Sequence, residues 1–72
     1  MSEELDNQVM LALKRMLHLI DQEIEVSERV CAARSESEFL ALVQEQATLH
    51  TEIGNARTEY EQLRERQKKS GI

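Results

Sequence analysis

The apolar residues of this chain recur at heptad spacing in two separate halves. The first half repeats Met10, Leu17, Ile24 and Cys31 every seven residues, each followed three residues later by Leu13, Ile20, Ser27 or Arg34. The second half repeats Phe39, Gln46, Ile53 and Tyr60, each followed three residues later by Leu42, Leu49, Ala56 or Leu63. Residues at alternating spacings of three and four lie on one side of an α-helix. The pattern therefore predicts an all-α fold with helices over about 3–34 and 37–68.

Between the two halves the repeat shifts by one residue. The step from Cys31 to Phe39 is eight residues instead of seven. A continuous helix would therefore turn its apolar side away from a partner helix at this point. Ser35 and Glu38 lie at the shift and have the spacing of a capping box, which begins a helix. We predict a two-helix antiparallel coiled-coil hairpin with its turn here. Because neither Gly nor Pro marks the midpoint, one unbroken helix from a longer coiled coil is the alternative.

Antiparallel pairing of the two repeats brings the two polar positions of the predicted core together. Ser27 is then opposite Gln46, and the two side chains can form a hydrogen bond. If Ser27 or Gln46 faced a Leu instead, its polar group would have no hydrogen-bond partner, at a cost of roughly 1–3 kcal/mol. Cys31 is expected as a packed thiol beside the turn. The predicted hairpin core consists of Met10, Leu13, Leu17, Ile20, Ile24, Leu42, Leu49, Ile53, Tyr60 and Leu63.

The first helix carries a second apolar stripe beside the first. One neighbouring helix cannot cover both stripes, and a helix that is apolar over so wide an arc is ordinarily buried on two sides. We predict that the second stripe binds a partner. Its members are Leu5, Val9, Ala12, Met16, Leu19, Val26 and Val30. A shorter extra stripe runs along the second helix from Leu40 to Gly54, and we expect it on the opposite side of the hairpin.

The size and charge of the chain limit its functions. Residues 1–72 make one small domain, with 1–2 and 69–72 expected to fray. A core of this size rarely supplies more than about 3–5 kcal/mol of net stability. One cysteine excludes an internal disulfide, so we expect a homodimeric four-helix bundle or a complex with a helical protein. The net charge of −5 disfavours binding to nucleic acid or an anionic membrane. The longest apolar run, residues 9–13, is too short to span a bilayer. A cytoplasmic location suits the lone thiol.

No residue pattern in the sequence supports catalysis. His18 and Asp21 lie one helical turn apart, but two ligands do not make a metal site. No carboxylate occupies a predicted core position, and neither a glycine-rich loop nor a nucleophile motif is present. We therefore expect a protein that is not an enzyme, with no cofactor. The basic residues between Arg57 and Lys69 support one alternative, a small regulator that acts on nucleic acid or its machinery.

The two heptad repeats, the turn at Ser35 to Ser37 and the surplus stripe from Leu5 to Ala33 give the chain a family resemblance. It resembles the small co-chaperones of bacterial type III secretion. In that family a two-helix protein pairs with a tetratricopeptide-type chaperone, and the pair keeps the needle subunit soluble before export. The resemblance implies an acidic helical hairpin that acts as a chaperone or adaptor for a helical partner.

Overall fold

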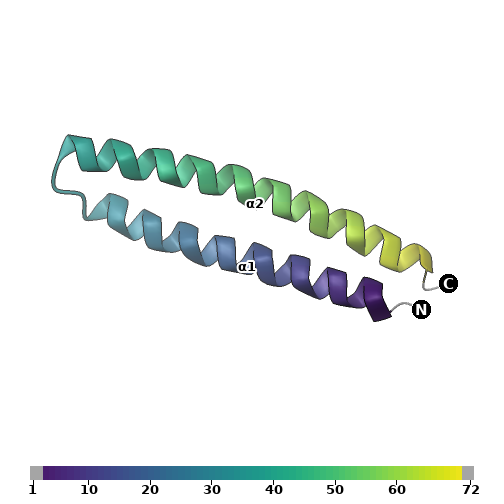
Figure 1. Cartoon of the computed structure of the whole chain (residues 1–72). Helices are drawn as coiled ribbons and strands as arrows, with labels where there is room; N and C mark the ends of the chain where they lie inside the picture. Colours follow the sequence, from purple (N-terminus) through teal and green to yellow (C-terminus); the bar gives the residue numbers. More distant parts are fainter. Residues whose placement is uncertain (1–2, 71–72) are drawn as a thin grey trace.

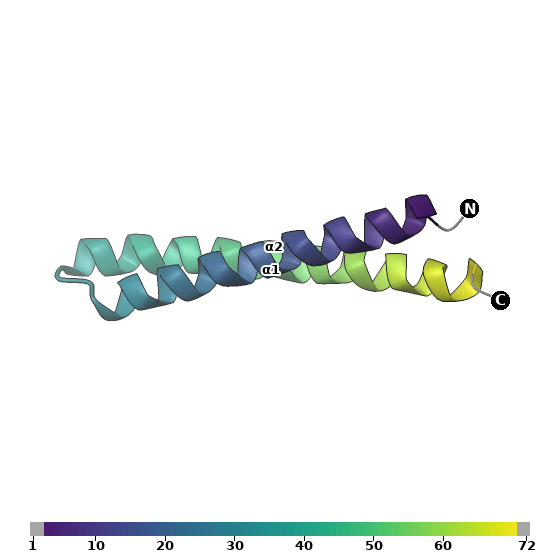
Figure 2. The same cartoon turned by 90° about the horizontal axis from the view of Figure 1, so that it is seen from below.

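The computed structural model describes residues 3–70, which form two long antiparallel helices joined by a short turn (Figure 1). Helix α1 spans Glu3–Cys31 and helix α2 spans Glu36–Ser70. Seen from below, the two helices cross near their midpoints (Figure 2). The molecule measures 55 × 14 × 12 Å. The prediction of an all-α helical hairpin is confirmed, and the alternative of one unbroken helix is wrong.

The ends of the helices differ slightly from the prediction. Helix α2 continues to Ser70, two residues beyond the predicted end at 68, and the expected fraying of residues 69 and 70 stays a prediction. The expected fraying of residues 1–2 and 71–72 lies outside the described residues. Helix α1 ends three residues before the predicted position 34, because the backbone tightens there. The N–H of Ala32 donates to the carbonyls of both Glu28 and Arg29, at 3.1 Å each. Bonds to the third preceding residue are a common way to end a helix.

Ser35 caps the start of α2. Its hydroxyl oxygen accepts a hydrogen bond from the N–H of Glu38 at 3.1 Å, and its carbonyl accepts the N–H of Phe39 at 3.0 Å. This is the N-cap arrangement that the spacing of Ser35 and Glu38 predicts. Helix α2 consequently begins at Glu36, one residue before the predicted start. No residue of the described chain has a positive φ angle, so the turn forms without a glycine.

The core lies along one line between the two helices. On α1 the buried residues are Val9, Ala12, Leu19 and Val26, and on α2 they are Leu49 and Ala56. Four partly buried side chains, Met16, Val30, Leu42 and Ile53, pack against the central cluster of these residues. Along α1 these positions are spaced by three and four residues, as in the seam of a coiled coil. The second stripe of α1 is therefore the seam that contacts α2.

The assignment of the first stripe to the hairpin core is wrong for α1. The exposed fractions of Met10, Leu17 and Ile24 are 52%, 50% and 54%, and Leu13 and Ile20 are only half-buried at the edge of the seam. Both stripes have heptad spacing, so spacing does not select between them. Beside the turn, however, the first stripe ends in Ser27 and Arg34, whereas the second continues with Val26, Val30 and Ala33. The second stripe buries more apolar surface where the hairpin closes.

The predicted axial register of the two helices is confirmed. The side-chain amide of Gln46 donates a hydrogen bond of 2.7 Å to the partly buried hydroxyl of Ser27. The amide of Gln67 donates to Asp6 at 2.6 Å, and His50 lies 3.0 Å from a carboxylate oxygen of Glu23. In each of these three contacts the two residue numbers add up to 73, as they do in the predicted pair of Ser27 with Gln46, so all three belong to one register. The prediction was thus right about the axial position of each residue along the hairpin and wrong about which side of α1 faces α2.

The matched pair Leu19→Ala and Leu17→Ala tests which stripe is the seam. Leu19 is buried, so its truncation leaves a cavity and is expected to lower the free energy of unfolding by about 2–4 kcal/mol. Leu17 is half exposed, so its truncation is expected to cost less than about 1 kcal/mol. Urea denaturation followed by circular dichroism, at a low protein concentration that suppresses association, measures both. A larger loss for Leu17→Ala would contradict the observed seam.

The hydrogen bond between Gln46 and Ser27 gives a second test. Ser27→Ala leaves the partly buried amide of Gln46 without this acceptor, and we expect a loss of about 1 kcal/mol. Ser27→Ala combined with Gln46→Leu removes both polar groups and is expected to recover most of that loss. If the double variant is less stable than Ser27→Ala in the same denaturation assay, the pair does not act as described.

Candidate interaction surface

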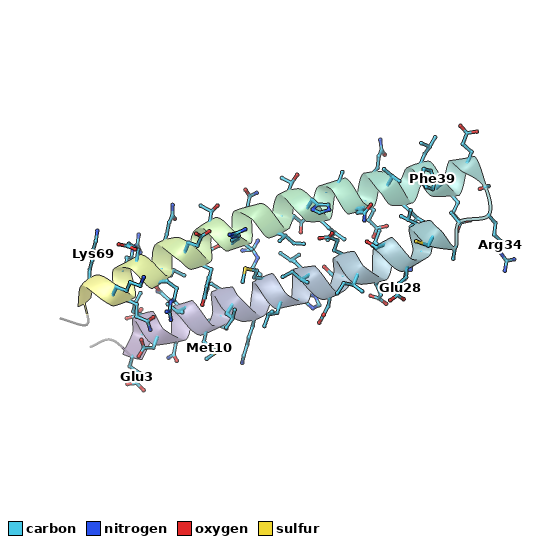
Figure 3. All side chains as sticks on the ribbon, turned by 180° about the vertical axis from the view of Figure 1, so that it is seen from behind. Glu3, Met10, Glu28, Arg34, Phe39 and Lys69 are labelled. Atoms are coloured by element: carbon cyan, nitrogen blue, oxygen red, sulfur yellow. The ribbon has the colours of Figure 1, made fainter. Side chains whose placement is uncertain are left out.

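Helix α1 presents a row of uncovered apolar side chains on the side that α2 leaves free. We call Met10, Leu13, Leu17, Ile20 and Ile24 the outer stripe. Three of the five are about half exposed although they are large and apolar. In Figure 3, Met10 lies on the side of α1 that faces away from α2. The outer stripe lies on one continuous helix whose other side packs against α2.

Contacts between the helices show which side of the hairpin carries the outer stripe. On one side, the polar flanks of the helices meet. There Arg15 lies 3.5 Å from Glu59, and Gln22, Arg29 and Glu45 line a hollow together with Val26 and Leu49. On the other side, Ser27 contacts Gln46 and Glu23 contacts His50. Ser27 continues the line of Leu13 and Ile20 at heptad spacing, so the outer stripe borders this second side.

Helix α2 adds apolar residues to the same side near the turn. Val43 lies seven residues before His50 and therefore on the same flank of α2. Leu40 and Ala47 are exposed beside it. The expectation that the extra stripe of the second helix lies opposite that of the first is wrong, because that expectation followed from the wrong rotation of α1. The outer stripe together with Leu40, Val43 and Ala47 forms what we call the apolar face.

Charged residues border the apolar face. In the half of α2 beyond Gly54 the same flank carries Arg57, which pairs with Glu61 at 3.3 Å. On α1, Lys14 and Asp21 follow Leu13 and Ile20 directly and are exposed. The side chains of Lys14 and Asp21 make no hydrogen bond or ion pair with residues 3–70. The apolar face is therefore longer on α1 than on α2, and two unpaired opposite charges lie along its outer edge.

No three His, Cys, Asp or Glu side chains of residues 3–70 are grouped so that they could hold a metal ion. Every buried side-chain nitrogen or oxygen described has a hydrogen-bond partner. Cys31, expected as a packed thiol, is exposed because it lies in line with the outer stripe and not in the seam. Within the described range, neither helix is long and apolar enough to cross a bilayer.

The predicted partner-binding residues lie inside the hairpin. Val9, Ala12, Leu19 and Val26 are buried, Leu5 is half-buried, and Met16 and Val30 pack on the central cluster. The assignment of these residues to a free surface is wrong, because α2 covers them. Substituting Leu19 with Glu would place a charge in the seam and disrupt the fold itself. The free apolar surface consists of residues that the sequence pattern had assigned to the core, and the polar end of that stripe at Ser27 and Arg34 was the available signal.

On the α2 half of the predicted core, the structure agrees more closely with the pattern. Leu49 is buried, and Leu42 and Ile53 pack against the central cluster. Tyr60 and Leu63 are half-buried farther along the same line. Helix α2 carries only one apolar stripe over most of its length, so its spacing leaves no choice of face.

Comparison with known proteins gives no relative for this arrangement. No protein-family model matches the chain, and neither a curated protein sequence nor a solved structure matches it.

Proposed function

We propose that this hairpin is a non-enzymatic protein-interaction module, a small chaperone or adaptor that docks its apolar face on a helical partner. The outer stripe carries this proposal. Its residues follow one another at spacings of three and four, which is the pattern by which one helix is recognised in a groove or beside another helix. The anchored seam on the far side of α1 keeps the stripe in one conformation before binding, which lowers the entropic cost of association.

The amount of apolar surface supports a specific contact. Full burial of a Leu, Ile or Met side chain from water is worth roughly 1.5–3 kcal/mol. Met10, Leu17 and Ile24 have about half of their surface left to bury, so each can contribute about 1 kcal/mol. Leu13, Ile20 and the α2 residues at the edge add to this contribution, and the partner buries apolar surface of its own against them.

Two finer statements about function stay predictions. The resemblance to type III secretion co-chaperones suggests a helical-repeat protein as the partner, and it rests on architecture. A cytoplasmic location rests on the single cysteine, which suits a reducing compartment.

The matched variants Leu17→Glu and Leu11→Glu test the proposed function. Leu17 lies at the centre of the outer stripe, whereas Leu11, with an exposed fraction of 66%, lies on the other flank of α1 beside Arg15. Both changes add one carboxylate at an exposed leucine, so both are expected to leave the hairpin folded. Partners are captured from the native cell on the immobilised chain and identified by mass spectrometry. The complex of the chain with each captured protein is then reconstituted from purified components.

Leu17→Glu is expected to weaken the reconstituted complex at least about tenfold, which corresponds to roughly 1.4 kcal/mol. Leu11→Glu is expected to bind like the unaltered chain. Equal binding by all three chains would mean that the apolar face is not the docking surface. A circular dichroism spectrum of each variant shows that the helices are intact.

A further inference from the structure

We infer that the outer stripe packs against the same stripe of a second copy, antiparallel, in a four-helix bundle with the two turns at opposite ends. The inference rests on the proposed function and names the partner helix. It starts from the spacing of the stripe. Two antiparallel helices interlock when the seven-residue repeats of both are aligned. In the central alignment, Leu17 faces Ile20 of the second copy and Leu13 faces Ile24 of the second copy, and each contact occurs twice by symmetry.

The charges beside the stripe favour this alignment. Lys14 and Asp21 each follow a residue of the stripe on its outer edge. In the central alignment, Lys14 of one copy lies beside Asp21 of the other, two residues or roughly 3 Å from the same level, and the dimer contains this pair twice. Within one chain the two residues are seven positions apart, which is too far for a pair on one helix. A second copy therefore supplies the partners that Lys14 and Asp21 lack in the hairpin.

A shift by one heptad in either direction is less favourable. One shift places Lys14 against Lys14 of the second copy and brings the carboxylate of Asp6 against Ile24. The opposite shift places Asp21 against Asp21 of the second copy and sets Ser27 against Leu17. Like charges in contact and polar groups against apolar ones both lower affinity. The central alignment sets Met10 against Ser27 at its ends, but it keeps Leu13, Leu17, Ile20 and Ile24 together and brings no like charges into contact along the edge.

Gly54 independently fits the same two-fold axis. The axis passes midway between Leu17 and Ile20. Residues of α1 and α2 that lie at the same level have numbers that add up to 73, so the axis passes α2 between residues 54 and 55. A glycine inside a helix costs roughly 1 kcal/mol relative to alanine. In the hairpin an added Cβ at Gly54 would meet nothing within 4 Å, so the hairpin itself does not require this glycine. At the axis, α2 passes α2 of the second copy, and a missing side chain permits a close approach there.

The other two-fold arrangement, with both turns at the same end, is disfavoured by charge. It would place α1 of one copy against α2 of the other. Met10, Leu13 and Leu17 would then lie level with the segment of α2 that carries Arg57, Glu61 and Arg64. Covering leucines with charged groups that must lose water is costly. The antiparallel arrangement instead buries the longer apolar stripe of α1 against itself, and only the shorter stripe of α2 meets the charged segment of α2 in the second copy.

A charge exchange tests the inference. The molecular mass is measured by analytical ultracentrifugation over a range of concentrations for the unaltered chain, Lys14→Glu, Asp21→Lys and the double variant. We expect the unaltered chain to be a dimer. Each single change replaces two attractive pairs by two repulsive ones and is expected to raise the dissociation constant about tenfold. The double variant restores both pairs with reversed signs and is expected to return to within about threefold of the unaltered chain. Arg29→Glu, a charge change of the same size as Lys14→Glu on the side of the hairpin away from the outer stripe, is the control and is expected to have no effect.

The outcomes separate this inference from the proposed function. A dimer that Leu17→Glu dissociates and the double charge exchange restores supports the inference, and capture of a foreign helical protein that Leu17→Glu abolishes supports the proposed function. A chain that is monomeric at every concentration but loses a foreign partner on Leu17→Glu overturns the inference and leaves the proposed function standing. A dimer that the charge exchange does not restore overturns the antiparallel alignment. If Leu17→Glu alters neither the mass nor partner capture, both proposals fail.

Discussion

The structure depends on the fact that α1 is apolar over a wider arc than one neighbouring helix can cover. Helix α2 takes the side that runs from Leu5 to Ala33, where Leu19 and Val26 pack with Leu49 and Ala56. Everything else in the molecule follows from this choice. The second side of the arc is left outside, so Met10, Leu17 and Ile24 become surface residues. A hairpin of this kind is stable along one seam and has an unsatisfied apolar surface along another.

Polar contacts fix the hairpin in one register without supplying much of its stability. The hydrogen bond between Ser27 and Gln46 and the pair of Glu23 with His50 lie on the same side of the seam and hold the helices at one level. Exposed ion pairs such as Arg15 with Glu59 are worth little on their own. A slip of the helices by one heptad would separate all of these partners at once. Polar groups at the edge of an apolar seam therefore provide specificity, while burial provides the free energy.

The same division between apolar burial and charge placement shapes the proposed assembly. The outer stripe supplies the apolar area, and Lys14 and Asp21 at its edge select one alignment among those that heptad spacing permits. Gly54 is costly for α2 as an isolated helix, yet it lies at the level where a two-fold axis through the stripe would pass. Features that the hairpin alone does not require thus fall together on one face, which is the pattern expected of a surface shaped by a partner.

The sequence by itself determined the two helices, the turn and the axial register. Heptad spacing, the capping spacing of Ser35 and Glu38, and the matching of Ser27 with Gln46 are local or pairwise signals, and each was enough on its own. On α2, a single apolar stripe also determined which residues face the core. On α1, only the tertiary structure decided which of two stripes became the seam. Both stripes have the same periodicity, and the sequence shows only that the first ends in the polar residues Ser27 and Arg34. The total burial of each stripe against α2 is a sum of many small contributions that is fixed only when the helices pack.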